Sequence, residues 1–528
     1  MNRRQFLSFS AATSLALAGC RDAQDTAHIQ GGFTNNTLLE RGHALRDRPA
    51  AWEAPTKIRK TRVLIAGGGV AGLAAARALR LKGMNDFILM ELQDKAGGNS
   101  QCTRVGGLLC PQGAHYLPLP TNDAPDVQNL LEELGLRQRV GGRWQYDERH
   151  LCHSPQERLF LHQQWQDGLL PIRGVDAGTL EQYQRFSTLV SDLRKAERWT
   201  IPLQNTATKP IQKALATITF MEWLDRQKLT DEYLRWYLNY CCRDDYGAGI
   251  DTVSAWAGIH YFASRHGFHA PSAEIPEREG LLTWPEGNSW ITQRLAEPLG
   301  ERLRTGQTVL RIAATKHGVE VDTLNAATHA IERWQAERVI VALPIFIAAR
   351  IIENPPEWVR QAIMRVVYAP WVVANIHIHQ PLDDHSGAPL SWDNVIYSNH
   401  AGQGLGYVNA SHQSLSPVLG SMVLTHYHAT DDRWDTLATE WKTWRDRIIS
   451  ELSAPHPDLA AKTTHIDITR YGHAMAIPVP HPEGKIGLHS FRHSVVAHER
   501  LSFAHSDWAG YSIFEEAFTM GHRAGDWG

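Results

Sequence analysis

Cysteine is scarce in this chain, and its spacing excludes the usual cysteine-based metal centres. Besides Cys20, the cysteines are Cys102, Cys110, Cys152 and the adjacent pair Cys241-Cys242. None of these spacings is typical of a zinc or iron–sulfur site, so we expect no metal site. A disulfide between Cys102 and Cys110 would be possible in an oxidising compartment.

An excess of one charge and a long apolar run are also missing. The formal net charge is -3 at pH 7, so nothing indicates binding to nucleic acid. The internal apolar stretch Val339–Ile352 is interrupted by Pro344 and Arg350, whereas a membrane-spanning helix needs about 20 apolar residues. A chain of 528 residues is too long for one core and predicts two associated domains.

The first twenty residues predict an export signal that is not part of the fold. Arg3-Arg4 followed by Gln5-Phe6-Leu7 is typical of twin-arginine export, which carries proteins already folded around a cofactor. Leu17-Ala18-Gly19-Cys20 resembles a bacterial lipobox, in which Cys20 is lipidated; the alternative is a plain cleaved signal with an incidental cysteine. We expect a periplasmic protein, exported by the twin-arginine machinery and held at a membrane by its N-terminal lipid. Residues 21–60 predict a tether and a lead-in segment.

A glycine-rich turn between a strand and a helix is the most informative part of the sequence. Arg62–Ala66 is β-prone, the run Gly67-Gly68-Gly69-Val70-Ala71-Gly72 fits G-x-G-x-x-G, and a helical pattern extends to Lys82. A second apolar run ends in Glu91, about 20 residues beyond Gly72. This order predicts the phosphate turn of a dinucleotide-binding βαβ unit.

Each residue of that turn has an expected role. Gly67 permits the tight turn, Gly69 lets backbone amides approach a pyrophosphate, and Gly72 lets helix and strand pack closely. Glu91 can accept both ribose hydroxyls, and the anion lies at the positive end of the helix.

Later passages make a family resemblance specific. Gly97-Gly98-Asn99 and Gly113-Ala114-His115 follow Glu91, and Arg500–Gly521 combines a strand, an acidic residue, a glycine-containing loop and a helix. The chain resembles the FAD-dependent amine oxidase superfamily, which includes monoamine and polyamine oxidases and related carotenoid desaturases. The resemblance implies bound FAD, with Gly97, Gly98, Asn99, Ala114 and His115 beside it. The family usually has arginine where Asn99 stands.

The resemblance assigns further cofactor contacts. The backbone at Val309, in the predicted hairpin Thr308–Ile312 and Gly318–Val321, would hold the adenine. Asp507 would lie near the ribityl-phosphate portion. Ser512 fits the N-cap of a capping box with Glu515, so the amides at Ser512 and Ile513 would face the flavin's pyrimidine end, where preorganised donors stabilise negative charge.

These passages predict an α/β protein with a discontinuous Rossmann-like FAD-binding domain and an inserted α+β substrate domain. The FAD-binding domain comprises residues 61–118, 280–350 and 482–528. The substrate domain comprises a helical part, 119–279, and a sheet part, 351–481.

The substrate domain offers a candidate binding loop and candidate catalytic residues. Asp244 and Asp245 lie in a polar, glycine-rich break that could attract a cation into a substrate tunnel; the alternative is a surface turn with helix caps. The family generally has a lysine in the strand around 372–379, but no lysine lies between Lys316 and Lys442, and Asn375 could lie near that place.

The segment 471–475 would supply the family's aromatic substrate cage, yet Tyr471 is its only aromatic residue. His473 is a candidate proton acceptor near neutral pH. No cysteine lies there, so we expect non-covalent FAD.

Three functions fit the sequence. The leading hypothesis is oxidation of an amine, such as a polyamine, by hydride transfer to FAD. The second is an FAD-dependent desaturase or dehydrogenase of an apolar substrate, which the missing lysine favours. The third is a non-enzymatic envelope flavoprotein whose FAD is structural.

Overall fold

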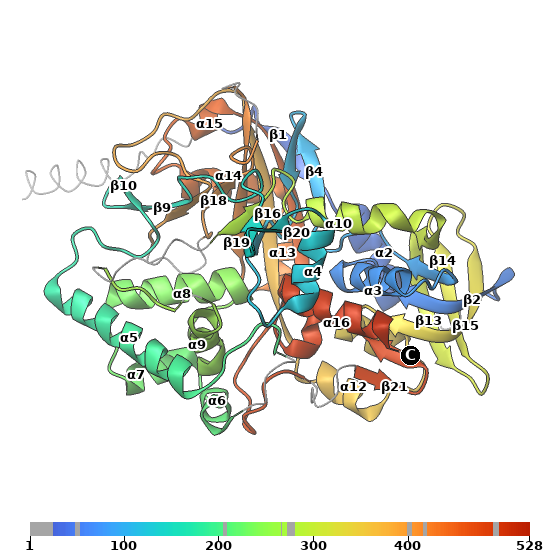
Figure 1. Ribbon diagram of the computed structural model, residues 1–528. Coiled ribbons are helices and arrows are strands. Elements are labelled where there is room, and N and C mark those ends of the chain that lie inside the picture. Colours follow the sequence, from blue (N-terminus) through green and yellow to red (C-terminus); the bar gives the residue numbers. More distant parts are fainter. Residues whose placement is uncertain are drawn as a thin grey trace, which may run out of the picture.

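The computed structural model describes residues 25–47, 53–203, 209–265, 267–271, 280–398, 404–414, 420–488 and 496–527. The expected export signal, including Arg3, Arg4 and Cys20, lies outside the described residues. Two sheets with flanking helices give the predicted mixed α/β fold (Figure 1).

The first sheet contains the glycine-rich turn. Its strands are β2 (Lys57–Ala66), β3 (Phe87–Met90), β12 (Leu303–Arg304), β13 (Gln307–Ala314), β14 (Val319–Asn325), β15 (Ile331–Val341), β21 (Val496–His498) and β22 (Leu501–Phe503). Their order is β12-β3-β2-β15-β14-β13, with β22 beside β15 and β21 beside β22. The pairs β3–β2, β2–β15 and β15–β22 are parallel, whereas β13, β14 and β15 are antiparallel.

Two helices next to this sheet approach each other backbone to backbone at two glycines. They are α3 (Val70–Leu81) and α16 (Phe514–Asp526). A Cβ on Gly521 would lie 2.0 Å from the carbonyl oxygen of Ala71, and one on Gly525 would lie 2.3 Å from that of Ala75. These distances are far below van der Waals contact, so only glycine permits this crossing. α16 lies beside α3 in Figure 1, with α4 (Pro125–Glu133) and α10 (Ser289–Ala296) packed nearby.

The second sheet forms one wall of the central cavity. Its strands, in spatial order, are β1 (Gln30–Phe33), β20 (Thr463–Ile477), β16 (Val367–Ile378), β19 (Met422–Ala429), β18 (Tyr407–Asn409), β17 (Asp393–Ile396), β9 (Glu157–Leu161) and β10 (Gln164–Asp167). The helices α13 (Arg433–Ala438), α14 (Trp441–Leu452) and α15 (Leu459–Lys462) accompany it.

Two expectations about chain organisation are corrected here. The prediction of a tether and lead-in over residues 21–60 is wrong for residues 30–46, because β1 pairs with β20 and α2 (Asn36–Arg46) follows it. The first inserted stretch is not purely helical, since β9 and β10 join the second sheet. β1, β9 and β10 are short and contain polar residues, so their place in the sheet was not evident from hydrophobic periodicity.

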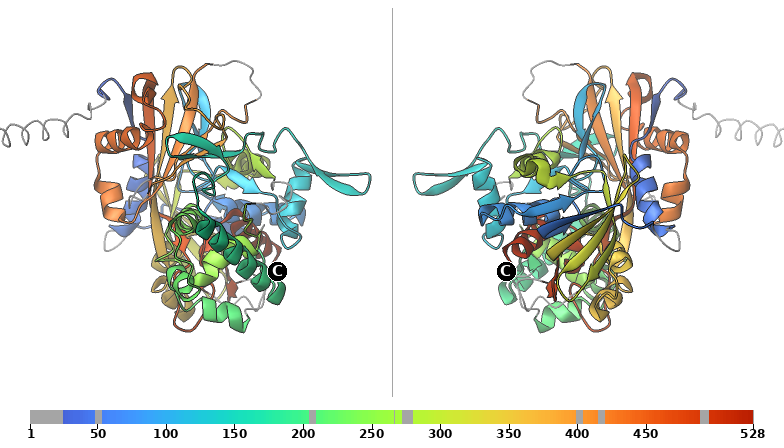
Figure 2. Two further views of the ribbon diagram at one scale, coloured as in Figure 1. Left: turned by 90° about the vertical axis from the view of Figure 1, so that its left-hand side faces the viewer. Right: turned by 90° about the vertical axis from the view of Figure 1, so that its right-hand side faces the viewer.

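A helical group and several small hairpins complete the described structure. The group comprises α5 (Ala177–Ala196), α6 (Pro210–Leu215), α7 (Phe220–Arg226), α8 (Glu232–Tyr246) and α9 (Ala255–Ala263), and α11 (Ile345–Ile351) and α12 (Glu357–Ile363) follow β15. The hairpins are β4 (Cys102–Val105) with β5 (Leu108–Pro111), β6 (Tyr116–Pro118) with β11 (Leu281–Thr283), and β7 (Arg137–Val140) with β8 (Arg143–Tyr146). The teal β7–β8 hairpin projects from the body in both views of Figure 2.

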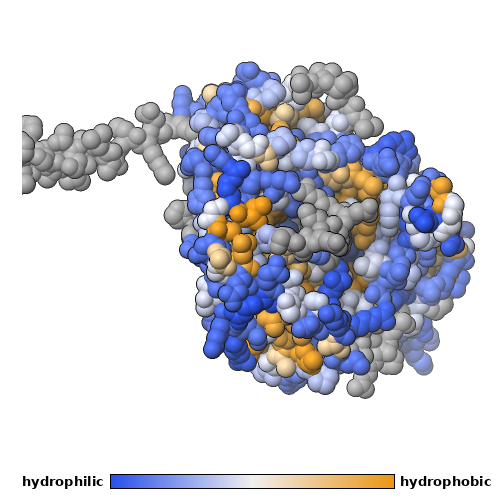
Figure 3. Space-filling view, turned by 60° about the vertical axis from the view of Figure 1, so that its left-hand side comes forward, coloured by the Kyte–Doolittle hydropathy of each residue, from blue (hydrophilic) through white to orange (hydrophobic). Residues whose placement is uncertain are grey.

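The surface is mainly hydrophilic on the face shown in Figure 3, where hydrophobic side chains form separate groups. Within the described ranges, no helix combines the length and the apolar character needed to cross a bilayer. Cys102 and Cys110 are both free thiols on the β4–β5 hairpin, where Cys110 pairs with Thr103 and not with Cys102.

Candidate functional site

A cavity of about 490 Å³ lies between the two sheets. Its walls come from the β2–α3 turn, from β16, β19 and β20 of the second sheet, from α8 and the end of α9, and from the start of α16. The cavity therefore touches every part of the chain for which a cofactor or substrate role was predicted.

The glycine-rich turn at the start of α3 has two distinct kinds of glycine. A Cβ on Gly72 would lie 1.8 Å from the carbonyl oxygen of Gly67, so Gly72 is required by the packing of helix against turn. A Cβ on Gly69 would meet nothing closer than the Cα of Gly98, 3.9 Å away. Gly69 is also the N-cap of α3 and makes no side-chain cap bond. The space in front of it suits an anion bound by the first amides of the helix.

Glu91 directly follows β3 and is held by hydrogen bonds from backbone amides. Its Oε2 accepts a hydrogen bond from the Gly68 amide at 2.8 Å, and its Oε1 accepts one from the Gln93 amide at 2.7 Å. Burial raises the pKa of Glu91 to about 7, and these amides oppose the rise. The carboxylate lines the cavity, where it can accept ribose hydroxyls as the sequence predicts.

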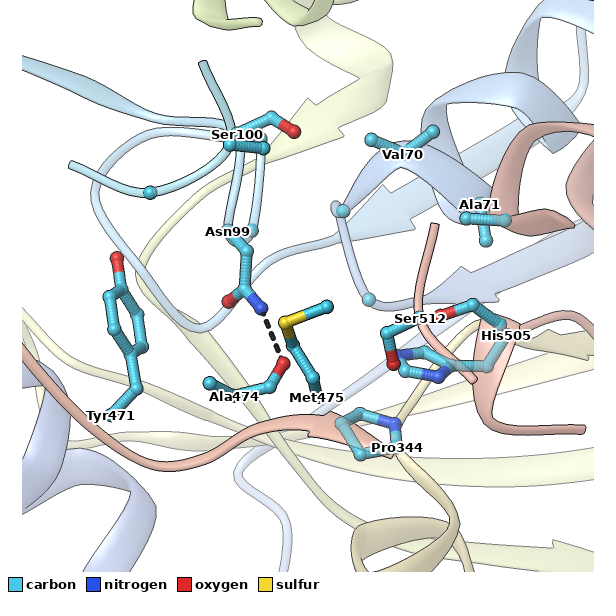
Figure 4. A pocket seen from close by; sticks show the side chains of 18 of the residues that line it. Val70, Ala71, Asn99, Ser100, Pro344, Tyr471, Ala474, Met475, His505 and Ser512 are labelled. Atoms are coloured by element: carbon cyan, nitrogen blue, oxygen red, sulfur yellow. Dashed lines mark hydrogen bonds between the residues drawn. The ribbon is translucent and has the colours of Figure 1, made fainter. Parts of the chain in front are cut away.

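The second glycine pair lies against the first turn. Gly69 and Gly97 form a parallel bridge, and Gly98 has a φ of +58° that favours glycine. The Asn99 side chain donates to the carbonyl oxygen of Ala474 at 2.8 Å. Figure 4 shows this bond reaching across to the second sheet, between Tyr471 and Met475.

Ala114 and His115 also line the cavity. The Ala114 amide and the His115 ring are nevertheless in contact with other residues of the protein. The Ala114 amide donates to the carbonyl of Asn99 at 2.9 Å. The His115 ring stacks on Tyr427 at 4.4 Å between centroids. Desolvation lowers the pKa of His115 to about 3, so its ring is neutral at pH 7.

Val309 and Asp507, two further predicted cofactor residues, also line the cavity. The pairing of β13 with β14 shifts between Val309 and Arg311, which marks a β-bulge at the residue predicted to contact adenine. The Asp507 carboxylate accepts from the Ile345 amide at 3.1 Å and from the Tyr368 hydroxyl. Desolvation opposes its ionisation, but His505 and these donors lower the pKa of Asp507 below its usual value. We interpret Asp507 as a positioning residue.

The predicted capping box at the C-terminal helix is wrong. α16 begins at Phe514 with Ile513 as its N-cap, and no side chain caps it. The Ser512 hydroxyl instead accepts a hydrogen bond from the Ala476 amide at 2.9 Å, which ties the loop to β20. The first amides of α16 consequently have no capping side chain, and residues 512–515 line the cavity. Figure 4 places Ser512 on the same side as Val70 and Ala71 of α3.

Asn375 does not fill the position of the family's lysine. Its amide donates to the carbonyl of Pro111 at 2.9 Å and its oxygen accepts from Thr425 at 2.7 Å, so it is a buried structural residue. The β16 residues that line the cavity are Tyr368, Trp371 and Val373. β16 is described throughout, and it presents no basic side chain to the cavity. Residues two positions apart on a strand point to the same face. The sequence alone therefore could not tell which of Trp371, Val373 and Asn375 lie at the cavity.

The other two catalytic candidates do line the cavity. Tyr471 donates its hydroxyl proton to the carbonyl of Gln112 at 2.8 Å. His473 stacks on Phe346 at 4.3 Å between centroids. Desolvation lowers the pKa of His473 to about 4, with a contribution from Arg433. His473 is therefore not the group titrating near neutral pH that the sequence predicted.

Asp244 and Asp245 line the cavity but do not lie in a loop. Both belong to the last turn of α8, which ends at Gly247 with a φ of +71°. Neither the predicted tunnel loop nor the alternative surface turn is correct, since Asp245 is only 8% exposed. The Tyr116 hydroxyl faces Asp244 Oδ2 at 3.5 Å, and Arg265 faces Asp245 at 3.5 Å.

Sequence reasoning missed two charged residues that complete this group. Arg265 follows α9 and Glu515 lies in the first turn of α16, and each acts electrostatically on the other. We call Asp244, Asp245, Glu515 and Arg265 the acidic cluster. Desolvation raises the pKa of Asp244 to about 7, and Asp245 adds to that rise. No local pattern links these residues, because they come from α8, from the segment after α9 and from α16.

The cavity fits FAD on several independent observations. The wall beside Gly69 is free of side chains, the amides of two helix N-termini are uncapped, and Glu91 closes the predicted ribose site. The glycine turn at the start of α3 would hold the pyrophosphate, Glu91 the ribose, and the first amides of α16 the flavin ring. Among the described residues lining the cavity there is no cysteine.

Comparisons with known proteins agree with this site. Residues 70–526 match the model of a family described as flavin containing amine oxidoreductase. An L-amino acid dehydrogenase of Synechocystis is 25% identical over 333 residues, 60% of this chain, and the chain spans only 63% of that relative's length. A putative flavin-containing monoamine oxidase of Mycobacterium tuberculosis is 25% identical over 88% of this chain and 95% of its own. The fold resembles that of putrescine oxidase bound to putrescine, with a TM-score of 0.66 and 17% identity over 89% of this chain and 98% of the other.

Replacing Gly69 with valine should remove FAD and leave the fold intact. The new side chain would enter space that holds no protein atom within 3.9 Å of its Cβ, which is the space expected to hold the pyrophosphate. Flavin absorbance per chain should fall below about a tenth of wild type, with an unchanged far-UV spectrum. Gly72→Ala is the contrasting variant, because its Cβ would lie 1.8 Å from the Gly67 oxygen and should destabilise the fold itself. Full flavin content in Gly69→Val would refute the assignment.

Acid precipitation should release all the FAD into solution. The reason is the absence of cysteine from the described cavity wall, which leaves no thiol to form a covalent link. The measurement is flavin absorbance in the supernatant and the pellet. Flavin that stays with the precipitated chain would contradict non-covalent binding.

Proposed function

The chain belongs to the flavin-containing amine oxidoreductases, and we propose that this FAD-dependent enzyme oxidises a small cationic amine, with a diamine or polyamine as the best fit. FAD, held by the β2–α3 turn, Glu91 and the start of α16, would supply the acceptor for a hydride from the carbon next to nitrogen, and hydrolysis of the oxidised product would release the carbonyl compound. The contribution of the chain is to orient that carbon, to exclude bulk water and to hold the charge of the substrate.

The observation that carries this proposal is the charge of the acidic cluster. Among the described residues it combines three carboxylates with one guanidinium, all at the cavity wall. Burying carboxylates without enough partners is costly. A cationic substrate supplies the missing positive charge. Asp244 is the best placed to accept an ammonium, since its nearest described partner is a neutral tyrosine at 3.5 Å.

The aromatic and aliphatic wall supports the same reading. Trp371 and Val373 of β16 and Tyr427 of β19 give the cavity an apolar surface that can pack the carbon chain of a substrate. Because β16 offers no base, the reacting amino group must arrive uncharged. A substrate with two amino groups meets both requirements, with one group charged at the acidic cluster and the other neutral at the flavin.

The residues of the cavity wall also bear on three rival hypotheses. An amino acid substrate would need a cation for its carboxylate, but the charge of Arg265 is already opposed by Asp245 and Glu515. A desaturase of an apolar substrate suits Trp371 and Val373 but leaves the acidic cluster unexplained. FAD with a purely structural role leaves both features unexplained.

The pH dependence of amine oxidation tests the role of Asp244. Because its pKa is raised to about 7, the charged carboxylate is present above about pH 7 and is lost as the pH falls below it. The apparent KM for a diamine should therefore increase as the pH falls through 7. Asp244→Asn should raise KM about tenfold or more at pH 8, since losing one partner of a buried charge pair costs about 2–5 kcal/mol, and should abolish the limb near pH 7.

Asp251→Asn is the matched control, since Asp251 is exposed on the segment after α8. It should leave KM unchanged, and flavin content should be equal in all variants. Anaerobic flavin bleaching would be followed with diamines, monoamines, L-amino acids and polyenes. Bleaching by amino acids or polyenes alone would reject the proposal, as would an Asp244→Asn variant with normal KM. Bleaching by dithionite but by no organic substrate would favour structural FAD.

We also propose that the enzyme is exported and lipid-anchored in the periplasm. The support is the sequence Arg3-Arg4-Gln5-Phe6-Leu7 and the lipobox ending at Cys20, together with a cofactor that would be loaded before export. Arg3-Arg4→Lys-Lys should retain the protein in the cytoplasm, and Cys20→Ser should move it from the membrane fraction to the soluble periplasmic fraction. Unchanged membrane fractionation of Cys20→Ser would exclude the lipid anchor.

A further inference from the structure

Two histidines and a glutamate converge on the far face of the second sheet, outside the cavity. His426 and His428 are alternate residues of β19, so both point to the same face. Glu451 lies in the last turn of α14, the helix that packs on that face. None of the three lines the cavity.

The ligand atoms are spaced as around a small metal ion. His426 Nε2 lies 3.1 Å from Glu451 Oε2, and His428 Nδ1 lies 3.6 Å from Glu451 Oε1. One ligand atom from each residue falls within 4.8 Å of the others. Ligands about 2.0–2.1 Å from a tetrahedral zinc ion are about 3.4 Å apart, so the spacing needs little adjustment.

Burial leaves one of these atoms without a partner. The side chains of His426 and His428 are 1% and 2% exposed, and that of Glu451 is 14% exposed. His428 Nδ1 faces the cluster and has no hydrogen-bond partner among the described residues. A buried polar atom left unpaired destabilises the folded state, and a bound metal ion would remove that penalty.

The surroundings close the site on further sides. The Gly404 amide donates to Glu451 Oε2 at 3.2 Å, and a Cβ on Gly404 would lie 2.4 Å from His426 Nε2. The backbone at Gly404 thus lies directly against the ligand atoms. The C-terminal end of α14 contributes partial negative charge, which favours a cation. Arg243 opposes a cation through its charge, and Asp431 offsets part of that charge.

We propose that His426, His428 and Glu451 bind one divalent transition-metal ion, with Zn²⁺ as the best fit, and that this ion fastens α14 to the second sheet. Two imidazoles and a carboxylate are the donor set that such ions prefer. A fourth ligand would be water or a small anion. The competing explanation is a carboxylate that only hydrogen-bonds two histidines. Cysteine spacing gave no hint of the site, because its ligands are histidines and a glutamate on separate elements.

The test uses the FAD-loaded full chain, purified without a polyhistidine tag and dialysed after addition of ZnCl₂. Elemental analysis should find one zinc per chain, and titration with a chromogenic chelator should give its affinity. His428→Gln and Glu451→Gln should weaken binding by more than the about 10–100-fold typical of an outer-shell change. Flavin content should not change, because neither residue touches the cavity.

His465→Gln is the matched control. His465 Nε2 forms a similar histidine–carboxylate pair with Asp467 at 2.8 Å, but without a third ligand. Its zinc content should equal that of wild type. Gly404→Ala should weaken zinc binding while leaving all three ligands in place, because its Cβ would displace His426.

Wild-type protein supplies an answer even if the ligand variants fail to fold. Chelator should lower its Tm and ZnCl₂ should restore it, because an ion that binds only the folded state stabilises it. The absence of bound metal together with a Tm insensitive to both would overturn the proposal. Equal zinc binding by wild type, His428→Gln and Glu451→Gln would also overturn it.

Discussion

The architecture of this enzyme depends on the direct contact of backbone with backbone around helix α3. On one side, Gly72 packs against the Gly67 carbonyl; on the other, Gly521 and Gly525 of α16 pack against the α3 backbone. This close approach at the two glycines brings the N-termini of both helices to the same cavity. Two sets of uncapped amides then face one ligand space, which suits a cofactor with a pyrophosphate at one place and an electron-rich ring at another.

The buried carboxylates show how their partners set the chemistry of the site. Asp507 and Asp244 are both desolvated, yet their pKa values move in opposite directions. His505, Tyr368 and a backbone amide keep Asp507 charged, so it serves the structure. Asp244 has a weak neutral partner and a carboxylate beside it, so it retains an unmet preference for a cation. That difference separates a positioning acid from the acid that we propose binds the substrate.

The sequence predicted those parts of the site that depend on short-range spacing. The glycines of the β2–α3 turn and Glu91 lie within one βαβ unit, and their contacts follow from that unit alone. The prediction for Asn375 was wrong because strand register is set by the neighbouring strands. The prediction of Ser512 as a helix cap was wrong because its hydroxyl accepts a hydrogen bond from β20, 36 residues away in the sequence. Asp244 was assigned to a loop because glycines follow it, whereas Gly247 in fact ends a helix that contains it.

Strand β19 links the two sites of this molecule through the alternation of its side chains. Tyr427 points to the cavity, where it stacks on His115, whereas His426 and His428 on either side of it point to α14. A ligand bound on one face of β19 is therefore connected to the other face through the strand backbone, but the two faces have no side chain in common. The hydrogen bond from Tyr427 to the carbonyl of Gly113 at 2.9 Å extends that link to the loop beside the predicted flavin position. Fastening β19 to α14 would restrain the position of an aromatic cavity wall without altering any charge in it, which makes the proposed ion a support for substrate packing and not a participant in oxidation.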